Sequence, residues 1–124
     1  MSIPGPARSP GFPIDTVIVN YRTGPLVVDC LESLAAERAR GAHVRAILVD
    51  NDSRDGSAEI VQAAITQREW HWATLLRSPS NGGFGAGCNL GIAHALARGS
   101  DARAIWLLNP LPQSAAFIIF FPGG

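Results

Sequence analysis

The chain has 124 residues, of which 47% are hydrophobic and 16% are charged, so length and composition predict one folded domain. Ten basic and ten acidic residues give a net charge of zero, which leaves no surplus of positive charge for a nucleic-acid backbone. All ten basic residues are arginine, and the absence of lysine excludes Schiff-base chemistry and the lysine of a P-loop.

Residues 1–13 are rich in proline and glycine and carry no apolar core of a signal peptide, so we expect a flexible lead-in. No apolar run reaches the length needed to span a membrane. The cysteines, Cys30 and Cys88, lack the spacing of a metal site and favour buried thiols in a reducing compartment. These features predict a cytoplasmic protein, which leaves docking at the inner face of the membrane open.

Short apolar runs predict four buried strands, at residues 16–20, 44–50, 73–77 and 104–108. Helical spacing of apolar residues between them predicts three helices, over 25–40, around 60–65 and over 88–98, the last with Leu and Ala on its buried side. Strands that alternate with helices through short connections predict an α/β fold with three layers, a parallel βαβ sheet covered by helices on both faces.

Polar and glycine residues collect where these predicted strands end. They are Asn20, Tyr21, Arg22, Asp50, Asn51, Asp52, Ser53, Asn81, Gly83 and Asn109. In a parallel sheet such positions line one edge, where ligands bind. An aromatic ring can stack on a base, a carboxylate can accept a hydrogen bond from a base or a ribose, and glycines let the backbone approach a phosphate. The pattern therefore predicts a nucleotide-phosphate site.

The glycine-dense segment at 81–87, which we expect to be a loop, does not identify the ligand by itself. Gly83 and Gly85 are followed by Cys88 where a dinucleotide fingerprint needs a third glycine, and no P-loop GK[ST] follows. Simple dinucleotide binding is therefore disfavoured. The alternative is that these glycines only allow tight packing of a helix on the sheet.

Four segments, spaced by whole βα units, resemble the N-terminal half of family 2 glycosyltransferases of the rhamnosyltransferase-like bacterial kind. They are VIVNYRT at 17–23, LVDNDSRDGS at 48–57, NGGFGAGCNLG at 81–91 and LLNP at 107–110. The resemblance covers residues 14–110 and implies the Rossmann-like GT-A fold of nucleotide-diphospho-sugar transferases. It also implies inverting transfer of a hexosyl or rhamnosyl group from a UDP-, dTDP- or GDP-linked sugar to the hydroxyl of a saccharide or lipid-linked acceptor, in cell-surface polysaccharide synthesis.

Position by position, the resemblance implies that seven residues bind the donor nucleotide. They are Asn20 and Tyr21 at the base, Asp50 at the base or ribose, Asn51 and Ser53 beside it, and Asn81 and Gly83 in the wall near the nucleotide. Asn109 begins the family's short metal-binding motif, in which an acid would hold Mg²⁺ or Mn²⁺ against the diphosphate.

The chain departs from the family pattern after Pro110. Leu111 stands where the resemblance calls for the acid of the metal motif, and residues 111–124 form a divergent apolar tail without Asp, Glu, His, Arg or Lys. The metal site is then incomplete and the family's general base is absent, so we expect a truncated domain. Two alternatives to a working transferase stay open: an inactive fragment, and a nucleotide-binding module without catalysis.

Overall fold

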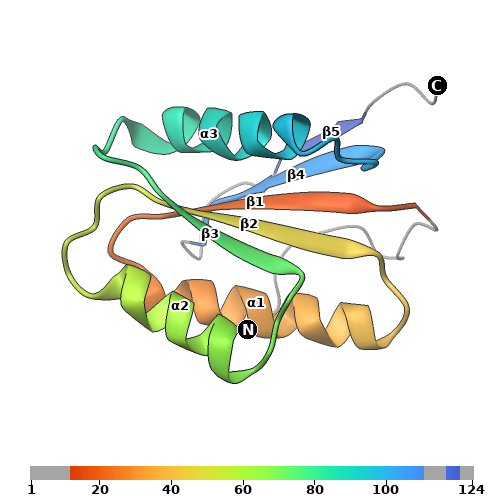
Figure 1. The fold of residues 1–124 in the computed structure, drawn as a ribbon, viewed down its shortest axis with the longest axis horizontal. Helices are drawn as coiled ribbons and strands as arrows, with labels where there is room; N and C mark the ends of the chain where they lie inside the picture. Colours follow the sequence, from red (N-terminus) through yellow and green to blue (C-terminus); the bar gives the residue numbers. More distant parts are fainter. Residues whose placement is uncertain (1–11, 111–116, 121–124) are drawn as a thin grey trace.

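The computed structural model describes residues 12–110 and 117–120, which form one sheet with helices on both sides (Figure 1). The elements in chain order are β1 (Ile14–Asn20), α1 (Gly24–Ala39), β2 (Val44–Asp50), α2 (Ser57–Gln67), β3 (Ala73–Arg77), α3 (Gly83–Ala97), β4 (Ala104–Leu108) and β5 (Phe117–Phe120). The strand order is β3-β2-β1-β4-β5. Strands β1 to β4 are parallel, which confirms the predicted α/β fold.

Strand β5 was not expected from the sequence. It lies within the segment that we expected to be an apolar tail, and it pairs antiparallel with β4, Leu107 opposite Phe117. The rest of that tail, at 111–116 and 121–124, and residues 1–11 of the expected lead-in lie outside the described residues.

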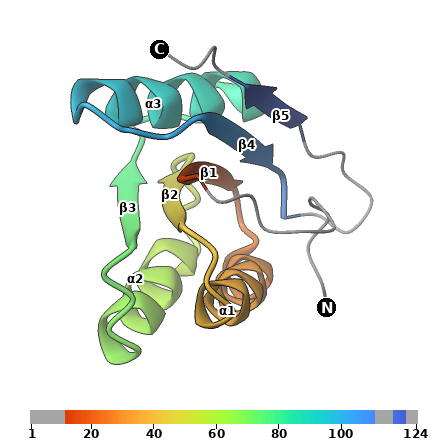
Figure 2. The same ribbon diagram turned by 90° about the vertical axis from the view of Figure 1, so that its right-hand side faces the viewer.

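The sheet is the middle of three layers, with α1 and α2 on one face and α3 on the other (Figure 2). Every residue of β1 is buried, as the sequence predicts for a central strand. Alternate side chains serve the two faces: Ile14 and Ile18 join the core under α1 and α2, while Val17 and Val19 join the core under α3.

The glycine-dense segment is largely helical, which corrects the expectation of a loop. Helix α3 begins at Gly83, five residues before the predicted start at Cys88. The prediction that Leu and Ala form its buried side holds for Ala95, which is 3% exposed, but is wrong for Leu90 and Leu96, which are 43% and 62% exposed. The residues of α3 that are buried against the sheet are Gly87, Cys88, Gly91 and Ala95.

Two of these glycines explain how α3 fits. A Cβ atom on Gly87 would lie 2.8 Å from Cγ1 of Val19, and one on Gly91 would overlap Cγ1 of Val17. Carbon atoms in contact are normally about 3.5–4.0 Å apart, so a side chain at either position would push α3 off the sheet. The packing alternative in the sequence analysis therefore accounts for Gly87, and close packing accounts for Gly91 as well.

The cysteines are free and buried in helices, as predicted, Cys30 in α1 and Cys88 in α3. Burial raises the pKa of both thiols to about 11, so both are neutral near pH 7. Of the helices that the structure describes, none is long and apolar enough to cross a membrane.

Candidate functional site

The strand ends fix where the candidate residues lie. Asn20 pairs with Asp50 in the β1–β2 register, and Asp50 pairs with Arg77 in the β2–β3 register, so three strands end at the same level. Strand β4 runs parallel to β1 and leads to Asn109 at this same edge. The topology therefore brings the predicted residues to the carboxyl edge of the sheet.

Asn20, Asp50 and Ser53 form a buried hydrogen-bonded network that joins two distant parts of the sequence. The side-chain amide of Asn20 donates to Asp50 Oδ1 at 2.7 Å and lies 3.3 Å from Ser53 Oγ. Ser53 Oγ donates to Asp50 Oδ1 at 2.7 Å, and the Ser53 backbone N–H donates to Asp50 Oδ2 at 3.1 Å. Asp50 Oδ1 therefore ties the end of β1 to the β2–α2 loop, and Asp50 Oδ2 braces that loop from within.

The β1–α1 connection is fixed by the same residues. Asn20 Oδ1 accepts from the backbone N–H of Thr23 at 3.0 Å and from its hydroxyl at 2.7 Å. Arg22 has a φ of 59°, a left-handed conformation that is costly for a residue other than glycine. Its backbone N–H donates to Ser53 Oγ at 2.9 Å, and its Nε donates to the Ser53 carbonyl at 3.2 Å.

Tyr21 lies between these anchored residues and is itself exposed. Its side chain is 41% exposed, whereas Asn20 and Asp50 are 1% and 5% exposed. The guanidinium carbon of Arg22 lies 5.2 Å from the centroid of the Tyr21 ring, within the range of a cation–π contact. The edge therefore presents one aromatic ring beside a buried polar network.

Asn51 joins the same edge to the first turn of α3. Its amide donates to the Gly83 carbonyl at 2.9 Å and lies 3.4 Å from Asn81 Oδ1, which in turn accepts from the Gly83 N–H at 2.9 Å. Asn51 Oδ1 is buried and finds no hydrogen-bond partner among the described residues. This oxygen lies against α3, 3.2 Å from the position that a Cβ atom on Gly87 would take.

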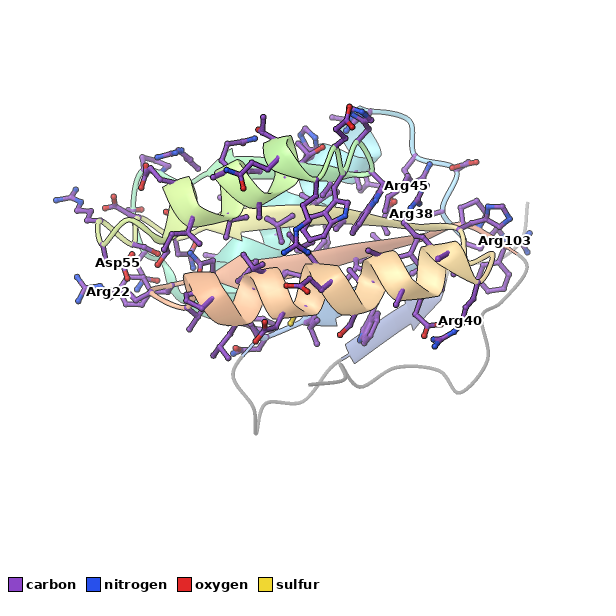
Figure 3. The ribbon with its side chains drawn as sticks, turned by 90° about the horizontal axis from the view of Figure 1, so that it is seen from below. Arg22, Arg38, Arg40, Arg45, Asp55 and Arg103 are labelled. Atoms are coloured by element: carbon purple, nitrogen blue, oxygen red, sulfur yellow. The ribbon has the colours of Figure 1, made fainter. Side chains whose placement is uncertain are left out.

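Asp55 supports the start of α2 at the same end of the molecule. Figure 3 shows Asp55 and Arg22 at one end of the sheet, with Arg38, Arg45 and Arg103 at the other. Hydrogen bonds from the Ser57 hydroxyl and backbone N–H, with the Arg22 charge as a smaller contribution, lower the pKa of Asp55. Asp55 therefore serves the helix start, which agrees with the helix-capping residue types of this loop.

The structure brings Asn20, Asp50 and Ser53 into direct contact, and Asn51, Asn81 and Gly83 into a second group. The sequence places Arg22 at the end of the first strand but gives it no role, and it does not single out Thr23. An Asn whose side chain accepts from the backbone three residues later is a known local pattern, so Thr23 could have been found from its spacing. No sequence pattern predicts the positive φ of Arg22.

Three cavities lie at the opposite, amino edge of the sheet. Those of ≈ 160 and ≈ 450 Å³ are lined by Arg45, His71 and Asp101 among others, and that of ≈ 170 Å³ by Asp15 and Ser100 among others; none of the three is lined by a predicted site residue. The case for the carboxyl edge therefore rests on strand-end geometry and on the exposed Tyr21 ring.

The residues were also tested for the divalent cation that the resemblance implies. Residues 12–110 and 117–120 contain no group of three or more His, Cys, Asp or Glu side chains that could hold a metal ion. Both Asp50 oxygens already accept hydrogen bonds from within the chain. These residues do not make up the donor set of a Mg²⁺ or Mn²⁺ site, and we assign no step to a metal.

The resemblance predicts a partial metal motif at Asn109, with Leu111 in place of its acid. Asn109 follows β4 at the carboxyl edge, whereas Leu111 lies outside the described residues, so the structure does not place it. A leucine side chain has no atom that can bind a cation, whatever its position. The partial metal motif at Asn109 therefore stays a prediction from the sequence.

Comparison with known families shows to which family the chain belongs. The model of the family described as glycosyl transferase family 2 matches residues 15–109, most of the described chain. The chain belongs to this family. The predicted family membership is thereby confirmed. No curated protein matches the sequence significantly.

Solved structures support the glycosyltransferase fold. A mannosyltransferase from Pyrobaculum calidifontis, solved with GDP-Man and Mn²⁺, has a TM-score of 0.68 and 16% identity over 88% of this chain. TarS from S. aureus, solved with UDP, has a TM-score of 0.62 and 17% identity over 79% of this chain. The chain spans 30% and 27% of the length of these two proteins, so the likeness concerns the fold of one part of each.

Proposed function

We propose that this glycosyltransferase family 2 chain binds the nucleotide of a nucleotide-diphosphate sugar at the carboxyl edge of β1 and β2. The observation that carries the proposal is the Tyr21 ring, which is 41% exposed although it directly follows the buried Asn20. A ring that is exposed yet anchored through both neighbours suits stacking on a base, because little freedom remains to be lost. The similar proteins were solved with GDP-Man and with UDP, which supports this class of ligand.

Each predicted residue then has a role. Tyr21 stacks on the base, and Asp50 accepts from a base N–H or a ribose hydroxyl with the lone pairs that its internal hydrogen bonds leave free. Asn20 and Ser53 hold Asp50 in place. Asn51, beside Asp50, ties this edge to the first turn of α3 through the Gly83 carbonyl.

The remaining wall comes from Asn81 and Gly83, at the start of α3. The Asn81 side chain accepts from the Gly83 N–H, and the Gly83 carbonyl accepts from Asn51. This arrangement ties the α3 end of the edge to the β2 end, so we assign both residues to shaping the site.

For the whole protein we propose inverting transfer of the sugar, hexosyl or rhamnosyl, to an acceptor hydroxyl in cell-surface polysaccharide synthesis. Family membership supports the transferase class. The acceptor, its general base, the inversion and a cytoplasmic location at the inner face of the membrane all belong to this proposal.

The test is titration of the protein with UDP, dTDP and GDP, with and without Mn²⁺, monitored by calorimetry. Tyr21→Ala is expected to weaken binding by about five-fold or more, because stacking on one base is worth roughly 1–3 kcal/mol. Ile60→Ala, which truncates an exposed side chain on α2, is the matched control and should bind as the wild type does. No detectable binding at millimolar nucleotide, or equal affinities for Tyr21→Ala and wild type, would overturn the assignment.

The incomplete metal donor set of the described residues supports a second candidate, a nucleotide-binding module without transfer. Binding that Mn²⁺ does not strengthen, together with no turnover of a nucleotide sugar, is the expected result for such a module. Turnover by this chain would exclude it.

A further inference from the structure

The conformation of Arg22 is strained, and its contacts explain what the strain supports. Arg22 has a φ of 59°, although a left-handed backbone costs an ordinary residue roughly 1–2 kcal/mol. The backbone is held there by the hydrogen bond from the Arg22 N–H to Ser53 Oγ. Backbone strain that surrounding contacts maintain is found preferentially at functional positions.

The side chain of Arg22 makes two contacts at once. Its Nε donates to the Ser53 carbonyl at 3.2 Å, and its guanidinium carbon lies 5.2 Å from the centroid of the Tyr21 ring. One contact fixes the guanidinium to the β2–α2 loop, and the other places it over the ring. Asp55 lies near Arg22 at this end of the sheet, and the Arg22 charge helps to lower the pKa of Asp55.

Within the described part of the chain, the Tyr21 ring has no second aromatic or cationic contact. With the guanidinium over one face, the opposite face of this partly exposed ring is the one left for a ligand. An arginine that stacks on one face of an aromatic ring presets the ring orientation before a base arrives.

We propose that Arg22 is a positioning residue for nucleotide recognition, which backs the Tyr21 ring so that a base can stack on its other face. This proposal rests on the proposed function, because it concerns the same edge. It adds a residue that the family resemblance did not assign. It also gives the positive φ a purpose, because the turn at Arg22 brings the guanidinium back over the preceding side chain.

The chain offers a matched control in Arg54. Arg54 is also an arginine at positive φ, 56°, in the neighbouring loop, and its Nε pairs with Asp52 at 2.9 Å. The cation over the Tyr21 ring is that of Arg22, and Arg54 does not share this role. Arg22→Gly and Arg54→Gly therefore remove the same side chain and relieve the same kind of backbone strain, and only the first removes the backing of the ring.

The first measurement uses the only tyrosine of the chain as its probe and does not depend on nucleotide binding. In Arg22→Gly, the NMR signals of the Tyr21 ring should move toward those of an unstructured tyrosine, while Arg54→Gly leaves them unchanged. Both variants should keep the urea midpoint of the wild type, because relief of strain offsets the lost side-chain contacts. Unchanged Tyr21 signals in Arg22→Gly would overturn the proposal.

The second measurement is nucleotide affinity. Arg22→Gly should bind about two-fold to five-fold more weakly than wild type, which is the loss expected for one cation–π contact at an exposed site. Arg54→Gly should bind as wild type does. In a Tyr21→Ala background, Arg22→Gly should cause no further loss, because it acts through the ring. If Arg22→Gly does not fold, Arg22→Asn serves instead, since asparagine tolerates positive φ.

The outcomes separate the two claims. Wild-type binding that Tyr21→Ala weakens, together with wild-type affinity in Arg22→Gly, refutes the role of Arg22 and leaves the proposed site standing. Absence of nucleotide binding refutes the site, and the Tyr21 signals then still decide whether Arg22 holds the ring.

Discussion

The contact between α3 and β1 gives a sharp prediction for Gly87→Ala. The added Cβ would lie 2.8 and 2.9 Å from the two Val19 methyl groups and 3.2 Å from Asn51 Oδ1. Carbon atoms normally approach to about 3.5 Å, so the overlap with Val19 is about 0.7 Å. Val19 is β-branched and sits in a fully buried central strand, so it cannot rotate away easily.

Overpacking of a core costs roughly 1–3 kcal/mol, and the rigid surroundings of Val19 place Gly87→Ala near the upper end. Alanine gains about 1 kcal/mol over glycine in a helix, which offsets part of this cost. We therefore expect a net destabilisation of about 2 kcal/mol, which for a domain of this size lowers the melting temperature by roughly 8 °C.

The assay is urea and thermal unfolding followed by circular dichroism. Gly85→Ala is the matched control, because it lies two residues earlier in α3 with nothing within 4 Å of its Cβ position, and it should gain about 0.5–1 kcal/mol. Combining Gly87→Ala with Val19→Ala should cost less than the two single changes added together. Equal or higher stability of Gly87→Ala would refute the close approach of α3 to β1.

Three further predictions concern buried polar groups. Asp50→Asn should destabilise the fold by about 1–3 kcal/mol in urea unfolding. An amide has one acceptor oxygen, so it cannot accept both from the Ser53 backbone N–H and from the donors that bond to the other carboxylate oxygen. Unchanged stability would contradict the network. Arg45→Met should lower the free energy of unfolding by about 1–3 kcal/mol, because the buried Asp15 carboxylate, 2.9 Å from Arg45 Nε, loses its ion pair. Adding Asp15→Asn should restore part of this loss, and full additivity of the two changes would contradict the pairing. Burial raises the Cys30 pKa from 9.0 in the unfolded chain to about 11, so the contribution of this thiol to stability should be fully present below pH 9 and be lost as the pH rises from 9 to 11. A Cys30→Ala variant whose stability falls equally at alkaline pH would contradict this cause.

The elements of the fold were readable because their signals are local. Strands β2, β3 and β4 begin and end at the predicted residues, since an apolar run between polar neighbours marks a buried strand whatever lies around it. Pro25 in the first turn of α1 and Gly41 after its end, with a φ of 101°, mark the helix limits by their own backbone preferences. The order of these elements is enough to predict a parallel sheet and its carboxyl edge.

Helix α3 shows where local signals fail. Its glycines predict a loop when only propensity is considered, and Leu90 and Leu96 predict a buried face. The structure places small residues against Val17 and Val19 because the sheet surface there is already filled by valine side chains. Which face of a helix is buried depends on the space that the sheet surface leaves for it, and the sequence of the helix does not determine that space.

The order of the residues is sufficient to predict an α/β chain whose polar residues gather at the strand ends, and the motifs are sufficient to place it in the glycosyltransferase family. How those polar residues share their hydrogen bonds follows only from the folded chain. The Asn20 and Asp50 side chains meet at 2.7 Å although a whole βα unit separates them, and the strained Arg22 folds back over Tyr21. The first contact depends on the register between β1 and β2, and the second on the hydrogen bond from the Arg22 N–H to Ser53; long-range packing sets both, and local propensity does not.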